Sequence, residues 1–112
     1  MVGWLKFRQM NFEVCRTIRA DHPSLPGHFP GAPIVPAVVI LDEVLAALSE
    51  WRADARLLGI PAVKFLAPLQ PEQPFTICLS STTNAQSEID FRCRVEDRVI
   101  VEGRLQFWRG SS

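Results

Sequence analysis

The stretch that decides the fold is Gly27-His28-Phe29-Pro30-Gly31-Ala32-Pro33-Ile34-Val35-Pro36-Ala37-Val38-Val39-Ile40-Leu41-Asp42. It begins as a loop, because five of the nine prolines fall between Pro23 and Pro36, and each fixes its own φ angle and restricts the residue before it. This excludes a helix or a central strand before Pro36. We expect an irregular but rigid loop that holds His28 in place.

A helix is predicted from Ala37 to about Trp51. Pro36 suits the first turn of a helix, where its missing N–H costs nothing, and neither proline nor glycine interrupts the residues that follow. Apolar side chains point in nearly every direction around this helix, which predicts that the rest of the protein surrounds it. At about 1.5 Å per residue the helix is roughly 22 Å long, which is too short for a typical membrane span.

Two acidic residues interrupt the apolar helix. Helical spacing aligns Asp42 with Val38, and Glu43 with Glu50. We therefore expect Glu43 to face the wetter side of the helix and Asp42 to face the buried side. An unpaired buried carboxylate costs several kcal/mol. Asp42, fourteen positions after His28, is accordingly a candidate for acid/base chemistry.

After the helix the hydrophobic period changes from 3.6 to 2. Ala55 to Phe65 is predicted to be a strand, and Gly59 and Pro61 within it indicate an irregularity or an edge position. Alternating patterns predict further strands at 75–82, 89–95 and 99–108, and one before the loop at 12–19. An antiparallel sheet curled around one central helix buries both the helix and the apolar strand faces. The predicted fold class is α+β.

Composition narrows the class of protein. A chain of 112 residues with 47% hydrophobic residues suits a single domain over 1–112, small enough to favour partnership with a second copy. Twelve basic and twelve acidic residues leave no net charge, which does not support nucleic-acid binding. The N-terminus has no signal-peptide core and no run of eighteen apolar residues occurs, so we expect a cytoplasmic protein with no membrane partner.

The cysteines and histidines do not indicate a metal site. Cys15, Cys78 and Cys93 are odd in number, widely spaced and set in apolar strand-like contexts, which predicts buried free thiols. Metal binding needs more ligands than two histidines and scattered acids provide. His22 is interpreted as structural. No metal or other cofactor is expected.

The motif Gly27-His28-Phe29-Pro30-Gly31-x-Pro33-x-x-Pro36, with an acid at position 42, resembles the signature of the hot-dog-fold 3-hydroxyacyl-(acyl-carrier-protein) dehydratases. The resemblance continues through 63–65 and 68–71 and so covers nearly the whole domain. It implies a hot-dog fold, in which an antiparallel sheet wraps around a long central apolar helix. The chain is most similar to the small dehydratase-like proteins of aryl polyene and related pigment gene clusters.

The resemblance also implies roles for particular residues. His28 would remove the proton α to the thioester carbonyl, and Asp42 would protonate or orient the leaving hydroxyl. Backbone N–H groups around Ala37, where the family usually has glycine, would meet the enolate-like charge. The substrate-binding residues implied are Phe29, Pro36, Ala37 and Val38. The implied partner is an acyl carrier protein that bears the acyl thioester. The implied assembly is a homodimer or hot-dog heterodimer in which His28 of one chain faces Asp42 of the other.

Two other functions remain open at the level of sequence. A hot-dog acyl thioesterase would hydrolyse the thioester with a carboxylate or an oriented water, and would release free thiol without enoyl product. A non-catalytic acyl-binding or partner subunit would retain the acyl ligand without turnover, and replacement of His28 would then change nothing. In either case Asp42 has a simpler role available, which is to hydrogen-bond loop backbone and hold the loop to the helix.

Overall fold

The computed structural model describes the chain apart from residues 1–10, 24, 26–33, 83–86 and 110–112. Its elements are β1 (Asn11–Arg16), α2 (Ala37–Trp51), β2 (Ala55–Phe65), β3 (Phe75–Ser81), β4 (Glu88–Val95) and β5 (Arg98–Arg109). The helix begins and ends where the sequence predicts. The four strands after it are confirmed, while the strand before the loop ends at Arg16, earlier than predicted.

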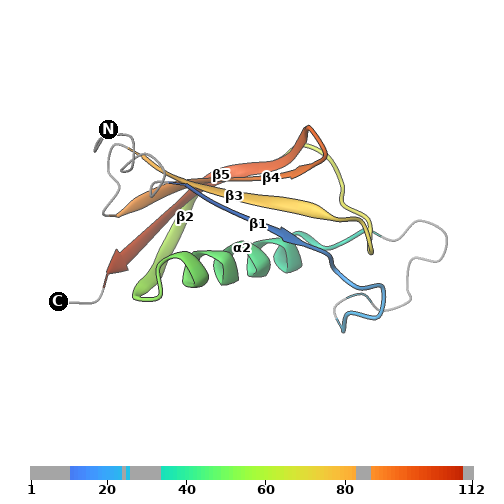
Figure 1. Cartoon of the computed structure of the whole chain (residues 1–112), viewed down its shortest axis with the longest axis horizontal. Helices are drawn as coiled ribbons and strands as arrows, with labels where there is room; N and C mark the ends of the chain where they lie inside the picture. Colours follow the sequence, from blue (N-terminus) through green and yellow to red (C-terminus); the bar gives the residue numbers. More distant parts are fainter. Residues whose placement is uncertain (1–10, 24, 26–33, 83–86, 110–112) are drawn as a thin grey trace, which may run out of the picture.

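The five strands form one antiparallel sheet in the order β1-β3-β4-β5-β2. β1 and β2 are the two edges, and α2 is the connection between them in the chain, so the helix lies against one face of the sheet (Figure 1). The predicted α+β arrangement of an antiparallel sheet and one helix is confirmed. Among the described residues, no helix is both long and apolar enough to cross a membrane.

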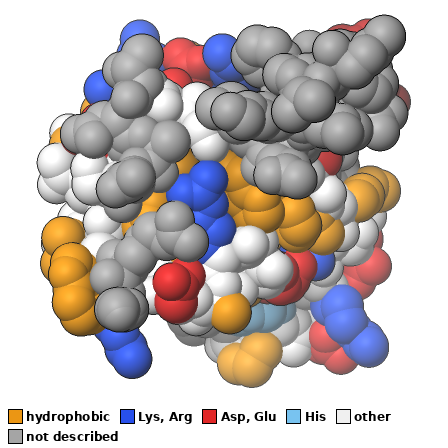
Figure 2. Space-filling model, turned by 60° about the vertical axis from the view of Figure 1, so that its left-hand side comes forward, with side chains coloured by type: hydrophobic (Ala, Val, Ile, Leu, Met, Phe, Trp, Pro, Cys, Tyr) orange, Lys and Arg blue, Asp and Glu red, His pale blue; other side chains and the backbone are white. Residues whose placement is uncertain are grey.

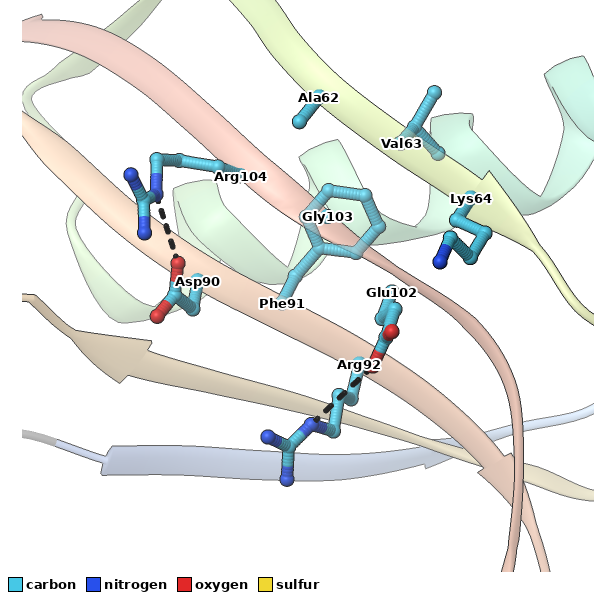
Figure 3. A pocket seen from close by; sticks show the side chains of 9 residues that line it. All are labelled: Ala62, Val63, Lys64, Asp90, Phe91, Arg92, Glu102, Gly103 and Arg104. Carbon is cyan, nitrogen blue, oxygen red and sulfur yellow. Dashed lines mark hydrogen bonds and ion pairs between the residues drawn. The ribbon is translucent and has the colours of Figure 1, made fainter.

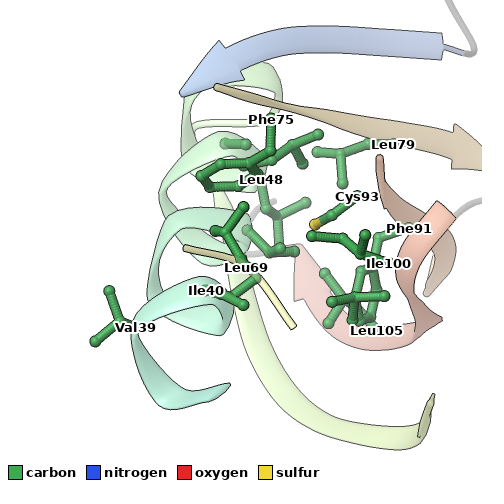
Figure 4. Close-up of a cluster of buried hydrophobic side chains, with 14 of the residues drawn as sticks. Val39, Ile40, Leu48, Leu69, Phe75, Leu79, Phe91, Cys93, Ile100 and Leu105 are labelled. Carbon is green, nitrogen blue, oxygen red and sulfur yellow. The ribbon is translucent and has the colours of Figure 1, made fainter. Parts of the chain in front are cut away.

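The core fills the space between α2 and the sheet (Figure 4). Most strand residues contribute to it by alternation, because successive side chains of a strand point to opposite faces; the consecutive Ile100 and Val101 of β5 are both buried. In β4, for example, Ile89, Phe91 and Cys93 are buried, while Arg92 between the last two is exposed. The helix contributes one buried stripe, formed by Val39, Ile40, Val44, Ala47 and Leu48.

β2 is the irregular edge strand that Gly59 and Pro61 indicate. Its pairing with β5 shifts register between Leu57 and Gly59 and again between Gly59 and Ala62. Proline cannot donate to a ladder and is tolerated where a strand is irregular or at an edge. In the sheet formed by the described residues, β2 is an edge strand with β5 as its one neighbour.

The segment leading from β1 toward the proline loop is anchored by Glu72. The backbone N–H of Glu72 donates to the carbonyl oxygen of Ile18 at 2.7 Å, and its side-chain Oε2 accepts from the backbone N–H of Ala20, also at 2.7 Å. Glu72 adopts a φ of 66°, a left-handed conformation that is uncommon for a residue with a side chain. This reciprocal pair of hydrogen bonds fixes the described start of the loop to the turn before β3.

The sheet face that points away from α2 is polar and carries a hollow of about 490 Å³ over β2, β4 and β5 (Figure 3). Charged side chains at its rim pair with each other: Arg104 Nε lies 3.0 Å from Asp90 Oδ1, and Arg92 Nε lies 4.0 Å from Glu102 Oε1. Gly103 and Phe91 also line it. Because its arginines already have carboxylate partners, this hollow is a weaker candidate for a functional site than the surface around the start of α2.

Candidate active site

The structure describes only one of the two residues predicted to perform acid/base chemistry, Asp42. His28 and Phe29 lie outside the described residues, so their predicted roles stay predictions. Asp42 lies on the second turn of α2 and its side chain is exposed, which contradicts the expectation that it faces the buried side. Glu43, expected on the wetter side, is half-buried instead.

The helix turns toward the sheet a different stripe from the one predicted. Periodicity alone did not distinguish the two stripes, because both contain apolar residues. Asp42 does align with Val38, as predicted, but that stripe points away from the sheet and Val38 is 60% exposed. Glu43 lies nearer the sheet because it has a cationic partner there. Arg16, the last residue of β1, donates from Nε to Glu43 Oε1 at 3.1 Å and pairs through Nη2 with Glu50.

Arg16 is a residue that the sequence interpretation missed. Its side chain is only 21% exposed and joins the first strand to two acids on the helix. A signal for it was present: Glu43 and Glu50 are seven positions apart and so lie on one face of an otherwise apolar helix. Two acids in that position call for a nearby cation.

The helix begins without a side-chain cap. Pro36 is the N-cap with an extended backbone, and its carbonyl oxygen accepts from the N–H groups of Val39 and Ile40. The first N–H groups of a helix have no intrahelical partner and carry partial positive charge. The N–H groups of Ala37 and Val38 belong to this set, and both residues are exposed.

An apolar groove of about 380 Å³ lies beside this helix start. It is formed between the residues around Pro36 and the segment that follows β2, which are held together by a hydrogen bond of 2.8 Å from the Val35 N–H to the Leu69 carbonyl oxygen. The lining residues are all apolar: Ile34, Val35, Ala37, Ile40, Phe65, Leu66, Ala67, Pro68 and Leu69. Such a groove suits a hydrocarbon chain whose polar end lies near Ala37.

Exposed apolar side chains surround this groove and extend along β2. Figure 2, which views the molecule from the side nearer the end of α2, shows further hydrophobic side chains exposed in separate patches. The large apolar residues with substantial exposure are Ile34, Val38, Leu57, Leu58, Val63, Phe65, Leu66 and Trp108. Of these, Ile34, Phe65 and Leu66 line the groove. Exposed apolar side chains that gather at a groove are typical of a binding site or a protein interface.

A more polar pocket of about 460 Å³ lies between Glu43 and the segment that follows β1. It is lined by Thr17, Ile18, Arg19, Asp21, His22, Pro23 and Glu43. Arg19 is engaged by Asp21, with its Nε 3.1 Å from Oδ1. The backbone of His22 is tied to its neighbours by hydrogen bonds to Arg19 and Leu25. These contacts support the structural interpretation of His22.

The three thiols are free, as predicted, but they differ in burial. Cys93 is buried, and burial raises its pKa to about 12. Cys78 is half-buried, and burial followed by the charge of Glu13 raises its pKa. Cys15 is exposed, because it lies on the outward-facing side of β1, so its predicted burial is wrong. The described residues contain no group of three or more histidine, cysteine, aspartate or glutamate side chains placed to hold a metal ion.

Comparison with known proteins gives concordant matches. A family model described as "ApeI-like: ApeI dehydratase" matches residues 5–104. The 3-hydroxyacyl-(acyl-carrier-protein) dehydratase FabZ of Chlamydia trachomatis serovar L2 is 32% identical over 104 residues, which cover 82% of this chain and 68% of the relative. FabZ of Chlamydia abortus is 30% identical with the same coverage.

Solved structures share the fold. The dehydratase heterocomplex ApeI:P from Xenorhabdus doucetiae matches with a TM-score of 0.76 and 22% identity, covering 90% of this chain and 89% of that one. An acyl-CoA hydrolase from Staphylococcus aureus matches with a TM-score of 0.72 and 11% identity, covering 95% of this chain and 66% of that one. These likenesses confirm the hot-dog fold expected from the proline-loop motif, and at such identities they show the fold alone.

Proposed function

The chain belongs to the family of ApeI-like dehydratases, and from this premise we propose that it dehydrates 3-hydroxyacyl thioesters carried on an acyl carrier protein to trans-2-enoyl thioesters. The observation that carries the proposal is the family match over residues 5–104, which includes both His28 and Asp42. The names of the FabZ relatives supply the substrate class. The apolar groove beside the helix start is consistent with an acyl chain.

The reaction assigns one proton transfer to each candidate residue. His28 takes the proton from C2 of the substrate, because an imidazole with a pKa near neutrality can act as a base at physiological pH. Asp42 gives a proton to the hydroxyl on C3, directly or through a water, and that hydroxyl leaves as water. The electron pair of the broken C2–H bond becomes the C2=C3 double bond, and His28 returns its proton to Asp42 through solvent.

The enolate-like oxygen is stabilised at the start of α2 in this proposal. Its negative charge develops on the thioester carbonyl, where preorganised N–H donors give the greatest benefit. Ala37 supplies such an N–H and lines the groove, and Pro36 sets the direction in which the helix begins. Val38, exposed beside Ala37, is proposed to contact the substrate near the thioester, and Phe29 to contact it from the loop.

We propose that the working form is a dimer of hot-dog chains, either two copies or this chain with a different one. Three features support this: the exposed apolar residues of α2 and β2, the position of β2 at the edge of the sheet that the described residues form, and the exposure of Asp42. A second chain that covers this surface would withdraw Asp42 from water. It would also bring the second chain's His28 to Asp42, in the arrangement that the family resemblance implies.

The test is turnover of a short 3-hydroxyacyl thioester on carrier protein, following enoyl formation and free thiol separately. The wild type is compared with His28→Ala and Asp42→Asn, with His22→Ala and Asp90→Asn as matched controls elsewhere in the chain. We expect enoyl product from the wild type and both controls, and its loss in the two site variants. Free thiol without enoyl would instead indicate a thioesterase.

A further outcome separates catalysis from binding. If no product of either kind forms from short, long or aryl substrates while circular dichroism shows an intact fold, the proposal of catalysis by this chain alone is wrong. The assay is then repeated with candidate hot-dog partner chains present. Activity that appears only in the mixture, and that survives His28→Ala in this chain, would identify it as a partner subunit.

A further inference from the structure

Two contacts join β1 to α2 along a seam formed by Phe12, Arg16, Glu43, Glu50 and Trp51. The rings of Phe12 and Trp51 stack with centroids 6.1 Å apart and an interplanar angle of 14°. At the other end of the strand Arg16 pairs with both Glu43 and Glu50. Because the earlier strand residue meets the later helix residue, β1 runs antiparallel to α2 along the seam.

The two elements match in length between these contacts. The four residue steps from Phe12 to Arg16 span about 13 Å at 3.3 Å per step of a strand. The eight residue steps from Glu43 to Trp51 span about 12 Å at 1.5 Å per step of a helix. The Phe12–Trp51 and Arg16–Glu43 contacts are therefore compatible with the lengths of both elements.

The seam also fixes the rotation of the helix. The buried stripe of α2 is wholly apolar and turns one side of the helix toward the sheet, while its apolar contacts lack the directionality of a hydrogen bond. The helix N-cap has no side-chain hydrogen bond, its first turn has no acidic residue and its last turn has no basic one. The hydrogen bond from Arg16 Nε to Glu43 is directional and half-buried, and the guanidinium is held by a second carboxylate. This ion-pair fork adds a directional contact to the apolar packing of the buried stripe.

We propose that Arg16 is a positioning residue for the dehydration reaction: by holding Glu43 and Glu50, it sets the rotation of α2 and so aims the Asp42 carboxyl, one residue before Glu43, at the substrate. The inference rests on the proposed function, in which Asp42 is the acid. Displacing a reacting group by about 1 Å can reduce turnover by up to ~100-fold. Loss of the fork would leave Glu43 and Glu50 with uncompensated charge beside the strand and allow the helix to rotate.

The matched control is Arg104, which is held in a comparable way by two carboxylates. Its Nε lies 3.0 Å from Asp90 Oδ1 and its Nη1 lies 3.9 Å from Glu88 Oε1, but these residues are on the outer face of the sheet, away from α2. We expect Arg16→Met to lower kcat by about tenfold with KM within about twofold of the wild type. Arg16→Lys should restore part of the loss, and Arg104→Met should leave both parameters unchanged.

A double-mutant cycle tests whether the effect passes through Asp42. In an Asp42→Asn background, where the acid is already absent, Arg16→Met should reduce the residual rate by less than about twofold. An equal tenfold loss in both backgrounds would overturn the inference, because Arg16 would then act elsewhere. If Arg16→Met does not fold, the same cycle is run with Arg16→Lys, whose partial loss of kcat should likewise disappear in the Asp42→Asn background. An equal loss in both backgrounds would overturn the inference.

Hydrogen exchange separates this inference from the proposed function, since it needs no turnover. Backbone amides of residues 40–46 should lose protection in Arg16→Met and keep it in Arg104→Met. Unchanged protection in Arg16→Met would refute the positioning role, whether or not the chain is a dehydratase. Lost protection in a chain whose wild type makes no enoyl product would support the orientation of α2 by Arg16 and refute the proposed function.

Discussion

Gly103, in the middle of β5, allows two neighbours to approach its backbone more closely than any side chain would permit. A Cβ atom at this position would lie 2.4 Å from the carbonyl oxygen of Ala62 and 2.8 Å from two ring carbons of Phe91. Ordinary contact begins at 3.4 Å, so the Ala62 carbonyl would have to move by about 1 Å. Neither neighbour moves easily, because Ala62 is paired to β5 and Phe91 is buried. Gly103→Ala should therefore strain the fold.

The magnitude follows from two opposing effects. Overpacking of a filled site costs about 1–3 kcal/mol, while replacing glycine by alanine recovers about 0.4–1 kcal/mol by restricting the unfolded chain. The free energy of unfolding should fall by roughly 1–2 kcal/mol, and Tm by about 4–8 °C for a domain of this size. Urea denaturation at a fixed protein concentration measures the change, since assembly makes stability depend on concentration.

Gly59 in β2 provides the matched control. The nearest atom to a Cβ there is Gln106 Oε1 at 3.9 Å, which is ordinary contact. Gly59→Ala should therefore leave stability unchanged or raise it by up to about 1 kcal/mol. If Gly103→Ala proved as stable as Gly59→Ala, the close approach of β2, β4 and β5 at Gly103 would be refuted.

Three further predictions concern assembly, the helix start and the thiols. Val63→Glu, on the strand face that continues to the buried Phe91, should dissociate the proposed dimer in sedimentation experiments. Lys64→Glu, on the opposite face of the same strand, should not. A dimeric Val63→Glu variant would contradict the interface. Ala37→Gly should raise kcat/KM for a short substrate by widening the approach to the helix N–H groups, at a cost of up to about 1 kcal/mol in stability. An unchanged kcat/KM would show that the methyl group does not restrict access. Burial raises the Cys93 pKa to about 12 from the ordinary value of 9.0, so the folded chain keeps a proton that the unfolded chain loses above pH 9. The free energy of unfolding should therefore fall by about 1.4 kcal/mol per pH unit between pH 9 and 12. Cys93→Ala should lack that contribution to the slope, and equal slopes for the two proteins would refute it.

Local sequence chemistry predicted the elements well where a single residue type decides the backbone. Pro36 and the absence of proline and glycine after it gave the helix its correct bounds. Gly59 and Pro61 indicated the irregular edge strand, and β2 shows both the register shifts and the edge position. The end of β1 was less predictable, because the residues after Arg16 are held by hydrogen bonds to the distant Glu72, which no local pattern contains.

The two acids of α2 show why burial was harder to predict than secondary structure. Periodicity correctly placed Asp42 with Val38 and Glu43 with Glu50, but it does not determine which of two apolar stripes meets the sheet. In the structure the buried stripe brings Glu43 close to Arg16, which is 27 positions before Glu43 and belongs to another element. A carboxylate can lie half-buried when a guanidinium is there to receive it, and so the sheet faces Glu43 and leaves Asp42 exposed.

The helix has apolar residues on a second stripe, which the sheet does not cover. A helix that is hydrophobic all round is one that becomes buried all round, yet the sheet of this chain covers only the stripe that includes Val39, Val44 and Leu48. The opposite stripe, with Val38 and Asp42, is left to water in the single chain. We infer that the second stripe is the one a partner chain covers, which places the exposed acid in the interface where the family resemblance puts catalysis. On this reasoning Val63→Glu should remove dimerisation and turnover together, while Asp42→Asn should remove turnover and leave the dimer intact.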